Sequence, residues 1–327
     1  MLPGRLEVAV SLGYLLCRIA DTIEDHPSVG GDVRGGLFRT FLEIMEDGRD
    51  PADLATGFET IVGDDAELSL ARAMPTVMRV FRAQSSSTIA ISTRWVTEMA
   101  RGMDLYTRRK PQDDGFLALY TVSDLDRYCY YVAGTVGHML TELFVDEMRA
   151  SGLDDRSATA LERRLREDAE NFAEGLQLVN ILKDVTDDRA RHVSFVPRTS
   201  LAAVGLEMSE LVLPEHRRRA HAAVGPLFDL ARERLDGALR YALAIPKTEL
   251  GIRLFCLLPL WMAARTLVVA RGNDAMFVAG EPVKIRRDEV EALIEECLTY
   301  VSDDAALEAR YAVLYREDPL ADRRRTA

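Results

Sequence analysis

The chain has 327 residues, of which 48% are hydrophobic, so it can bury a full core as one large domain or two. Its formal charge is −12, from 41 Lys and Arg against 53 Asp and Glu. This acidity excludes a general nucleic-acid-binding protein, which would show a basic face. The four cysteines form no C-x-x-C pair and are expected to be small core residues in a reducing compartment.

The segment 1–25 predicts a buried helix that ends in an acidic motif. Apolar residues recur there with helical spacing, and His26-Pro27 ends the pattern. An acid-x-x-acid-acid motif occupies the last turns and is made by Asp21, Glu24 and Asp25. Residues 27–36 are expected to form a glycine-rich loop, because their spacing does not match the phosphate-binding G-x-G-x-x-G pattern.

Helical periodicity continues through the rest of the chain, and no sustained alternating pattern predicts a strand. Ser123 is expected to cap a helix that runs to about residue 149. In that helix, Gly134 and Gly137 leave space beside the backbone for another helix or for an apolar ligand. The other predicted helices span 37–46, 66–83, 87–106, 157–188, 215–243 and 249–269, with a loop at 107–115 and a basic connector at 280–287. The sequence therefore predicts an all-α fold.

The predicted helix 157–188 ends in a second acidic motif with the spacing of the first. On a helix with about 3.6 residues per turn, its polar side chains fall on one stripe. The stripe consists of Gln177, Asn180, Asp184, Asp187 and Asp188. Because like charges at this spacing repel one another, the helix gains nothing from them, and a cation is expected nearby.

Two such helices facing each other would place six carboxylates around a gap, where Mg²⁺ would clamp a diphosphate. Arg18 and Lys183 are then candidates to bind the leaving phosphate oxygens, with Gln177 on the same stripe. Arg191 lies in the segment 189–197, here called the flap segment, and would close over the bound anion. The alternative is that each acidic cluster is a solvated helix face and that Arg191 is a solvated loop residue.

The longest uncharged run, from Tyr128 to Thr141, is shorter than the roughly 20 residues that cross a bilayer. We therefore expect a cytoplasmic protein that contacts a membrane at most peripherally.

The chain resembles the squalene and phytoene synthases, the head-to-head branch of the isoprenoid synthases. Residues 21–25 resemble the first aspartate-rich motif of that family, and residues 180–188 resemble the second. Residues 128–137, Tyr-Cys-Tyr-Tyr-Val-Ala-Gly-Thr-Val-Gly, are similar to the tyrosine-bearing signature between them. Residues 255–259 and 283–286 resemble the squalene synthase branch in particular.

The resemblance implies one isoprenoid synthase domain over residues 1–327, a helical bundle with a central apolar channel and the acidic helices opposed at its mouth. It implies that Mg²⁺ and diphosphate are bound by Asp21, Glu24, Asp25, Asp184 and Asp188, with Asp187 close by. Tyr128 would assist proton handling in the first half-reaction. Asn180, Lys284 and Arg286 would lie near a reduced nicotinamide cofactor, NADPH.

Two departures from the family pattern concern the diphosphate site. Relatives begin with a further helix that carries a Ser-Arg-Ser-Phe-like segment, whereas this chain starts at Leu2-Pro3-Gly4-Arg5, after it. We favour a start codon assigned too late over a protein that lacks part of its anion site. In the flap segment, Val193 stands where many relatives carry an arginine, and Arg191 is an approximate substitute.

The first hypothesis is therefore a Mg²⁺-dependent prenyltransferase that condenses two farnesyl diphosphates to squalene, through presqualene diphosphate and with reduction by NADPH. An alternative is a dehydrosqualene or phytoene synthase, in which a proton is lost instead of a hydride being added. A hypothesis of another class is a catalytically silent subunit that binds prenyl lipids. Because the product is insoluble, peripheral membrane contact is expected at its release.

Overall fold

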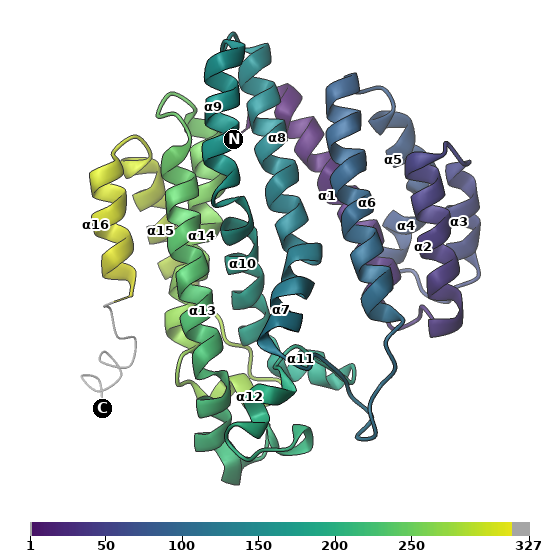
Figure 1. Ribbon diagram of the computed structural model, residues 1–327, viewed down its shortest axis with the longest axis vertical. Helices are drawn as coiled ribbons and strands as arrows, with labels where there is room; N and C mark the ends of the chain where they lie inside the picture. Colours follow the sequence, from purple (N-terminus) through teal and green to yellow (C-terminus); the bar gives the residue numbers. More distant parts are fainter. Residues whose placement is uncertain (1, 316–327) are drawn as a thin grey trace. The chain divides into compact units, whose positions relative to one another are not determined.

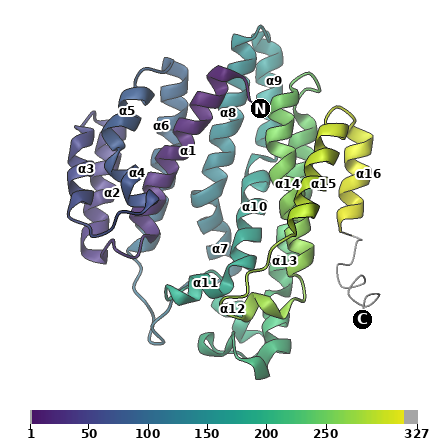
Figure 2. The same cartoon turned by 180° about the vertical axis from the view of Figure 1, so that it is seen from behind.

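The computed structural model describes residues 2–315 and divides into two compact units. Of the described residues, the N-terminal unit consists of 2–110 and 130–166, and the C-terminal unit consists of 111–129 and 167–315. Apart from two strands of two residues each, the regular elements of residues 2–315 are helices (Figures 1 and 2). The predicted all-α fold class is thus confirmed.

The N-terminal unit is built around α1 (Gly4–Asp25), which packs against α2, α4, α5, α6 and α8. Leu16, Ile19 and Ile23 have no exposed surface, and their spacing of three and four residues places them on one face of the helix. The helix ends as predicted, because His26 is extended and Pro27 cannot donate a hydrogen bond. The other elements are α2 (Gly31–Glu46), α3 (Pro51–Glu59), α4 (Ala66–Arg72), α5 (Met74–Phe81), α6 (Ser86–Thr107), the π-helical turn η1 (Tyr130–Gly134), α8 (Thr135–Ala150) and α9 (Asp155–Arg166).

The predicted glycine-rich loop 27–36 is wrong in its second half, because α2 already begins at Gly31. Phe38 and Phe41 are fully buried on this helix, so packing of its apolar face outweighs the poor helix propensity of its glycines. The segment between the predicted helices 37–46 and 66–83 contains a further helix, α3. Its N-cap is Asp50, whose side chain accepts a hydrogen bond from the amide of Ala52 at 2.9 Å.

The helix expected from Ser123 to about residue 149 is interrupted. It consists of α7 (Val122–Cys129), η1 and α8. The cap is Thr121 rather than Ser123, because the Thr121 hydroxyl accepts from the amide of Asp124, whose carboxylate accepts from the amide of Thr121. π-Helical turns of this kind are frequent at functional sites.

The C-terminal unit contains α10 (Ala169–Lys183), which packs against α13 (Arg217–Ala244) and α14 (Leu250–Ala270) (Figures 1 and 2). The approach of α10 to α13 is close, since a Cβ added at Gly237 would lie 2.5 Å from the Cβ of Asn171. The remaining elements are α7, β1 (Leu117–Ala118), α11 (Val185–Ala190), β2 (Val193–Ser194), α12 (Arg198–Ala202), η2 (Met208–Glu210), η3 (Pro214–His216), η4 (Asp274–Phe277), α15 (Arg287–Tyr300) and α16 (Asp304–Leu314).

The long helix predicted over 157–188 is instead three helices, α9, α10 and α11. The backbone leaves the α-helical region at Asp168 (φ −124°, ψ 11°) and at Asp184 (φ −107°, ψ 19°). Neither break carries a proline or a glycine, so no local signal marks them in the sequence.

Among the described residues, α14 is the one helix long and apolar enough to cross a membrane, judged by length and composition alone. Of the apolar window that passes this test, 56% is buried inside the protein, and buried core helices pass the same test. Arg253 on this helix has no exposed surface and bonds to Asp304 at 2.6 Å, which suits a core position. The finding gives only a weak indication of membrane association.

Candidate functional site

The first acidic motif lies in the last turns of α1, in the N-terminal unit. Asp21 and Glu24 are half-buried and Asp25 is exposed, whereas Thr22 and Ile23 between them are buried. The alternation follows from helical geometry, because the buried residues continue the apolar face of α1. The carboxylates are thereby held on a rigid helix end that the core fixes.

Arg18 pairs with the first of these carboxylates. Its Nη1 donates to Oδ2 of Asp21 at 3.1 Å, and its Nη2 lies 3.5 Å from Oε1 of Glu67. Burial raises the pKa of Asp21 to about 6; Arg18 opposes this rise and Asp25 adds to it. The raised pKa means that the bond from Arg18 does not outweigh the desolvation of this carboxylate.

Two further residues hold the end of α1, and the sequence did not single them out. Arg34, on α2, donates through Nε to the carbonyl of Ile23 and through Nη2 to the carbonyl of Val29, both at 2.9 Å. Nε2 of His26 lies 3.0 Å from Oδ2 of Asp65, the N-cap of α4. These contacts join residues of different segments, so periodicity within one helix gives no signal for them.

The second acidic motif lies in the C-terminal unit, across the junction of α10 and α11. Asp184 is half-buried, Asp187 is exposed and Asp188 is buried. The amide of Asp184 donates to the carbonyl of Asn180 on α10, and its carbonyl accepts from the amide of Asp188 on α11, both at 3.0 Å, so Asp184 ends one helix and begins the next. Of the predicted stripe, Asn180 is exposed and Gln177 is half-buried on α10.

Both basic residues predicted beside this motif bond to its carboxylates. Lys183 pairs with Asp184 through Nζ, and Nη2 of Arg191 donates to Oδ1 of Asp188 at 2.7 Å. Burial raises the pKa of Asp188 to about 6; the bond from Arg191 opposes this rise, and Asp184 and Asp187 reinforce it. Both motifs therefore combine a partly desolvated carboxylate with a basic partner.

Within each unit, the described residues contain no group of three Asp, Glu, His or Cys side chains arranged to hold a metal ion by themselves. Each motif offers hard oxygen donors, which suit Mg²⁺, in an incomplete set.

Tyr128 is buried near the end of α7, with 7% of its surface exposed. Its ring stacks on Phe195 of the flap segment, with ring centroids 4.6 Å apart and an angle of 24° between the planes. Sequence reasoning did not identify Phe195. The segment is also tied to the C-terminal unit by Arg189, whose Nη1 donates to the carbonyl of Met208 at 2.6 Å.

The residues expected near a nicotinamide cofactor are exposed. Lys284 and Arg286 follow η4, which packs against α11, and Arg286 is the N-cap of α15. Nε and Nη2 of Arg286 donate to the two carboxylate oxygens of Asp288 at 3.0 and 2.9 Å. The exposed positive charges of Lys284 and Arg286 suit the phosphates of a dinucleotide.

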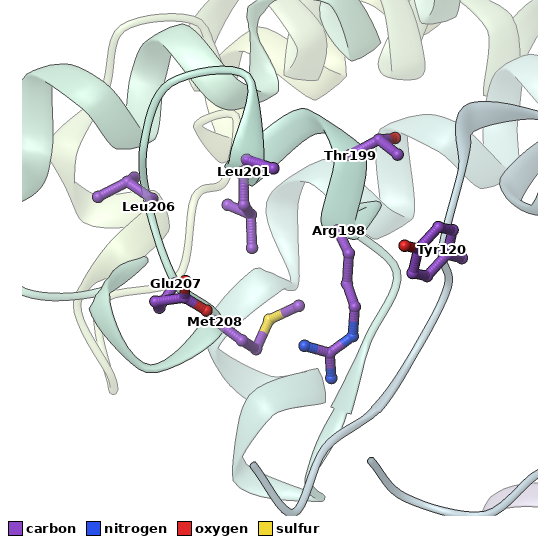
Figure 3. Close-up of a pocket in the computed structure, with 8 residues that line it drawn as sticks. Tyr120, Arg198, Thr199, Leu201, Leu206, Glu207 and Met208 are labelled. Carbon is purple, nitrogen blue, oxygen red and sulfur yellow. The ribbon is translucent and has the colours of Figure 1, made fainter. Parts of the chain in front are cut away.

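A separate pocket of about 190 Å³ lies beside the flap segment (Figure 3). It is smaller than the roughly 300 to 1,000 Å³ of typical ligand pockets, so we do not assign the substrate to it. Its lining residues are Tyr120, Arg198, Thr199, Leu201, Ala202, Leu206, Glu207 and Met208.

Comparison with known proteins gives one consistent result. A family model described as squalene/phytoene synthase matches residues 1–289. Squalene synthase of Schizosaccharomyces pombe is 27% identical over 295 residues, which cover 90% of this chain and 60% of that protein. Squalene synthase of Cyberlindnera jadinii is 27% identical over 309 residues, which cover 91% of this chain and 63% of that protein. The chain thus spans about six tenths of the length of these relatives.

Solved structures show the same fold. Ligand-bound TcSQS has a TM-score of 0.77 at 24% identity, covering 96% of this chain and 84% of that one. A dehydrosqualene synthase in complex with a ligand has a TM-score of 0.60 at 22% identity, covering 92% of this chain and 88% of that one. The fold is therefore that of these isoprenoid synthases. Because the family model matches most of its length, the chain belongs to the squalene/phytoene synthase family.

Proposed function

We propose that the chain is a Mg²⁺-dependent prenyltransferase that condenses two molecules of farnesyl diphosphate head to head, through presqualene diphosphate, to squalene. The observation that carries this proposal is the repeated arrangement of carboxylates with a basic partner at the ends of two core helices. Arg18 bonds to Asp21 in one motif, and Arg191 bonds to Asp188 in the other. Membership of the squalene/phytoene synthase family supports the same class of reaction.

The donor chemistry of both motifs fits Mg²⁺, which prefers carboxylate oxygen and is usually held by one or two carboxylates together with substrate phosphates. The raised pKa values of Asp21 and Asp188 support this fit, because partly desolvated carboxylates gain from a nearby cation. When bound, Mg²⁺ stabilises the charge of the departing diphosphate. The residues that would hold it are Asp21, Glu24, Asp25, Asp184, Asp187 and Asp188.

The basic side chains would bind the diphosphate itself. Arg18, Lys183 and Arg191 already neutralise carboxylates, and metal ions at those carboxylates would release them toward phosphate oxygens. Gln177, half-buried on α10, would donate an amide hydrogen to the same group. The proposal requires that both motifs contact one diphosphate.

Departure of the first diphosphate leaves an allylic cation, which the double bond of the second substrate attacks. Loss of a proton then closes the cyclopropane ring of presqualene diphosphate. Tyr128 would assist this proton transfer, and its burial supports the role because such cations must be shielded from water. NADPH, when bound near Asn180, Lys284 and Arg286, supplies the hydride that ends the second half-reaction. Peripheral membrane contact would serve product release.

The test is incubation with farnesyl or geranylgeranyl diphosphate and Mg²⁺, with and without NADPH, followed by identification of the hydrocarbon. The proposal expects squalene from farnesyl diphosphate when NADPH is present. Asp21→Asn and Asp184→Asn should abolish diphosphate release and keep the helical circular dichroism. The matched control is Asp47→Asn, which makes the same replacement at an exposed residue, the C-cap of α2. This variant should stay active.

The other outcomes separate the alternatives. If dehydrosqualene or phytoene forms although NADPH is present, the chain is a non-reductive synthase and not a squalene synthase. Tight binding of a farnesyl diphosphate analogue without any product would favour the catalytically silent subunit. Full activity in either motif variant would refute the proposed role of the carboxylates.

A further inference from the structure

The ring of Phe195 lies against the ring of Tyr128 in a stacked pair. A centroid distance of 4.6 Å is at the short end of the range in which aromatic pairs attract one another. Tyr128 is buried and Phe195 is half-buried. Phe195 therefore covers one face of the phenol ring to which the proposed function gives a role in proton transfer.

The backbone on both sides of Phe195 is fixed by hydrogen bonds to the segment that precedes α7. The amide of Leu119 donates to the carbonyl of Ser194 at 3.2 Å, and the amide of Arg198 donates to the carbonyl of Leu119 at 3.0 Å. Ser194 is buried. The base of the Phe195 side chain is thus held by the same segment that leads into the helix carrying Tyr128.

The preceding turn is also constrained. His192 has φ 58°, the one positive φ outside glycine in the described residues. The left-handed region is unfavourable for a non-glycine residue, so this conformation persists only where the surroundings require it. Its carbonyl accepts from the amide of Leu117 at 2.9 Å, and its ring lies 5.7 Å from that of Phe116. The guanidinium of Arg189 covers Phe116 at 4.5 Å. These contacts hold the turn in a conformation that leads the chain toward Phe195.

We propose that Phe195 is a positioning residue for Tyr128, and that the flap segment acts on the reaction by holding that phenol ring in one orientation. The inference rests on the proposed function. It predicts that replacing Phe195 by a non-aromatic residue slows the chemical step and leaves binding of the prenyl diphosphate and of the metal largely intact.

The first measurement does not depend on activity. The protein is labelled with 3-fluorotyrosine, and the fluorine resonance of Tyr128 is assigned by its loss in Tyr128→Phe. Phe195→Leu should shift or broaden this resonance, because the stacked ring is gone, whereas Phe195→Tyr should keep it close to its original position. Phe172→Leu is the matched control, since Phe172 stacks on Tyr241 at 5.1 Å in the same unit and should move the Tyr241 resonance alone.

The second measurement is steady-state kinetics with farnesyl diphosphate. Phe195→Leu should lower kcat roughly tenfold to a hundredfold, the scale expected when a reacting group loses its orientation, and should change KM by less than about twofold. Phe195→Tyr should restore most of kcat. An unmoved Tyr128 resonance in Phe195→Leu, or equal loss of kcat in both Phe195 variants, would overturn the proposal. If the unmodified chain forms no product, the proposed function fails, and the fluorine spectra still show whether the ring of Phe195 stacks on that of Tyr128.

Discussion

Arg191 donates a hydrogen bond at 2.7 Å to Asp188, three residues before it in the chain. Arg18 makes the same kind of bond at 3.1 Å to Asp21, three residues after it. Each acidic motif therefore holds an internal cation at a carboxylate that we assign to metal binding. An arginine and a metal ion compete for the same oxygen atoms, so the arginine lowers the affinity of the motif for the metal alone.

Arg191→Gln should raise the affinity for Mn²⁺, used as a probe of the proposed Mg²⁺ site, about 1.4-fold to fivefold without diphosphate. This gain corresponds to the roughly 0.2 to 1 kcal/mol of an exposed ion pair, and the Arg191 side chain is 40% exposed. With inorganic diphosphate present, the variant should bind the anion more weakly. Titration calorimetry measures both, with Arg287→Gln, which removes an exposed pair on α15, as the control. A lower affinity for Mn²⁺ alone would contradict the competition.

A second prediction concerns the contact between α6 and η1. A Cβ added at Gly102 would lie 2.1 Å from Cγ of Tyr131, so Gly102→Ala should lower the free energy of unfolding by about 1 to 3 kcal/mol. Gly36→Ala is the matched control, because Gly36 lies within α2 and a Cβ there meets nothing within 4 Å. It should stabilise the protein by up to about 1 kcal/mol. Urea unfolding compares them, and equal effects would exclude the steric explanation.

The first acidic motif could be predicted because it depends on spacing within one helix, whereas the second crosses the unmarked break between α10 and α11. Asp21 and Asp184 each follow an apolar run with helical period, and the structure places both near the end of a core helix. The loop predicted at Gly36 is wrong because glycine favours turns, whereas the buried apolar face of α2 keeps this residue helical. The stack of Phe195 on Tyr128 could not be predicted, because it joins residues far apart in the sequence and no local pattern reports such a contact.

Glu174 predicts a pH dependence of stability. It has 3% of its surface exposed, and burial raises its pKa from 4.5 to about 7; Arg234 opposes this rise, and Glu170 and Asp126 reinforce it. Burial alone would lower the pKa of Arg234, but Glu174 and Asp126 outweigh it, so the arginine stays charged and the carboxyl takes up the proton. The folded state therefore binds this proton more tightly than the unfolded state does.

The stability that this proton provides is complete below pH 4.5 and is lost as the pH rises through about 7. In Glu174→Gln this loss should be absent. The unfolding free energy of the variant minus that of the unmodified protein should therefore rise by on the order of 1 to 3 kcal/mol between pH 4.5 and 8. Urea unfolding at a series of pH values gives this difference. A difference that stays constant or falls with pH would show that Glu174 is ionised in the folded protein.

The last prediction concerns the ion pair between the buried Arg253 and the half-buried Asp304, which joins α14 to α16. Arg253 has no exposed surface, and its Nη1 and Nη2 donate to the carbonyl of Ile245 at 2.8 Å and to Oδ1 of Asp304 at 2.6 Å. Asp304→Ala should destabilise the protein by about 3 kcal/mol, because it leaves a buried guanidinium without its carboxylate. Asp303→Ala, which removes only the N-cap of α16, should cost about 1 kcal/mol. Arg253→Met combined with Asp304→Ala should recover part of the loss, since an apolar replacement of both charges leaves neither one unpaired. If the double variant were less stable than Asp304→Ala alone, the charge of Arg253 would not be the source of the loss.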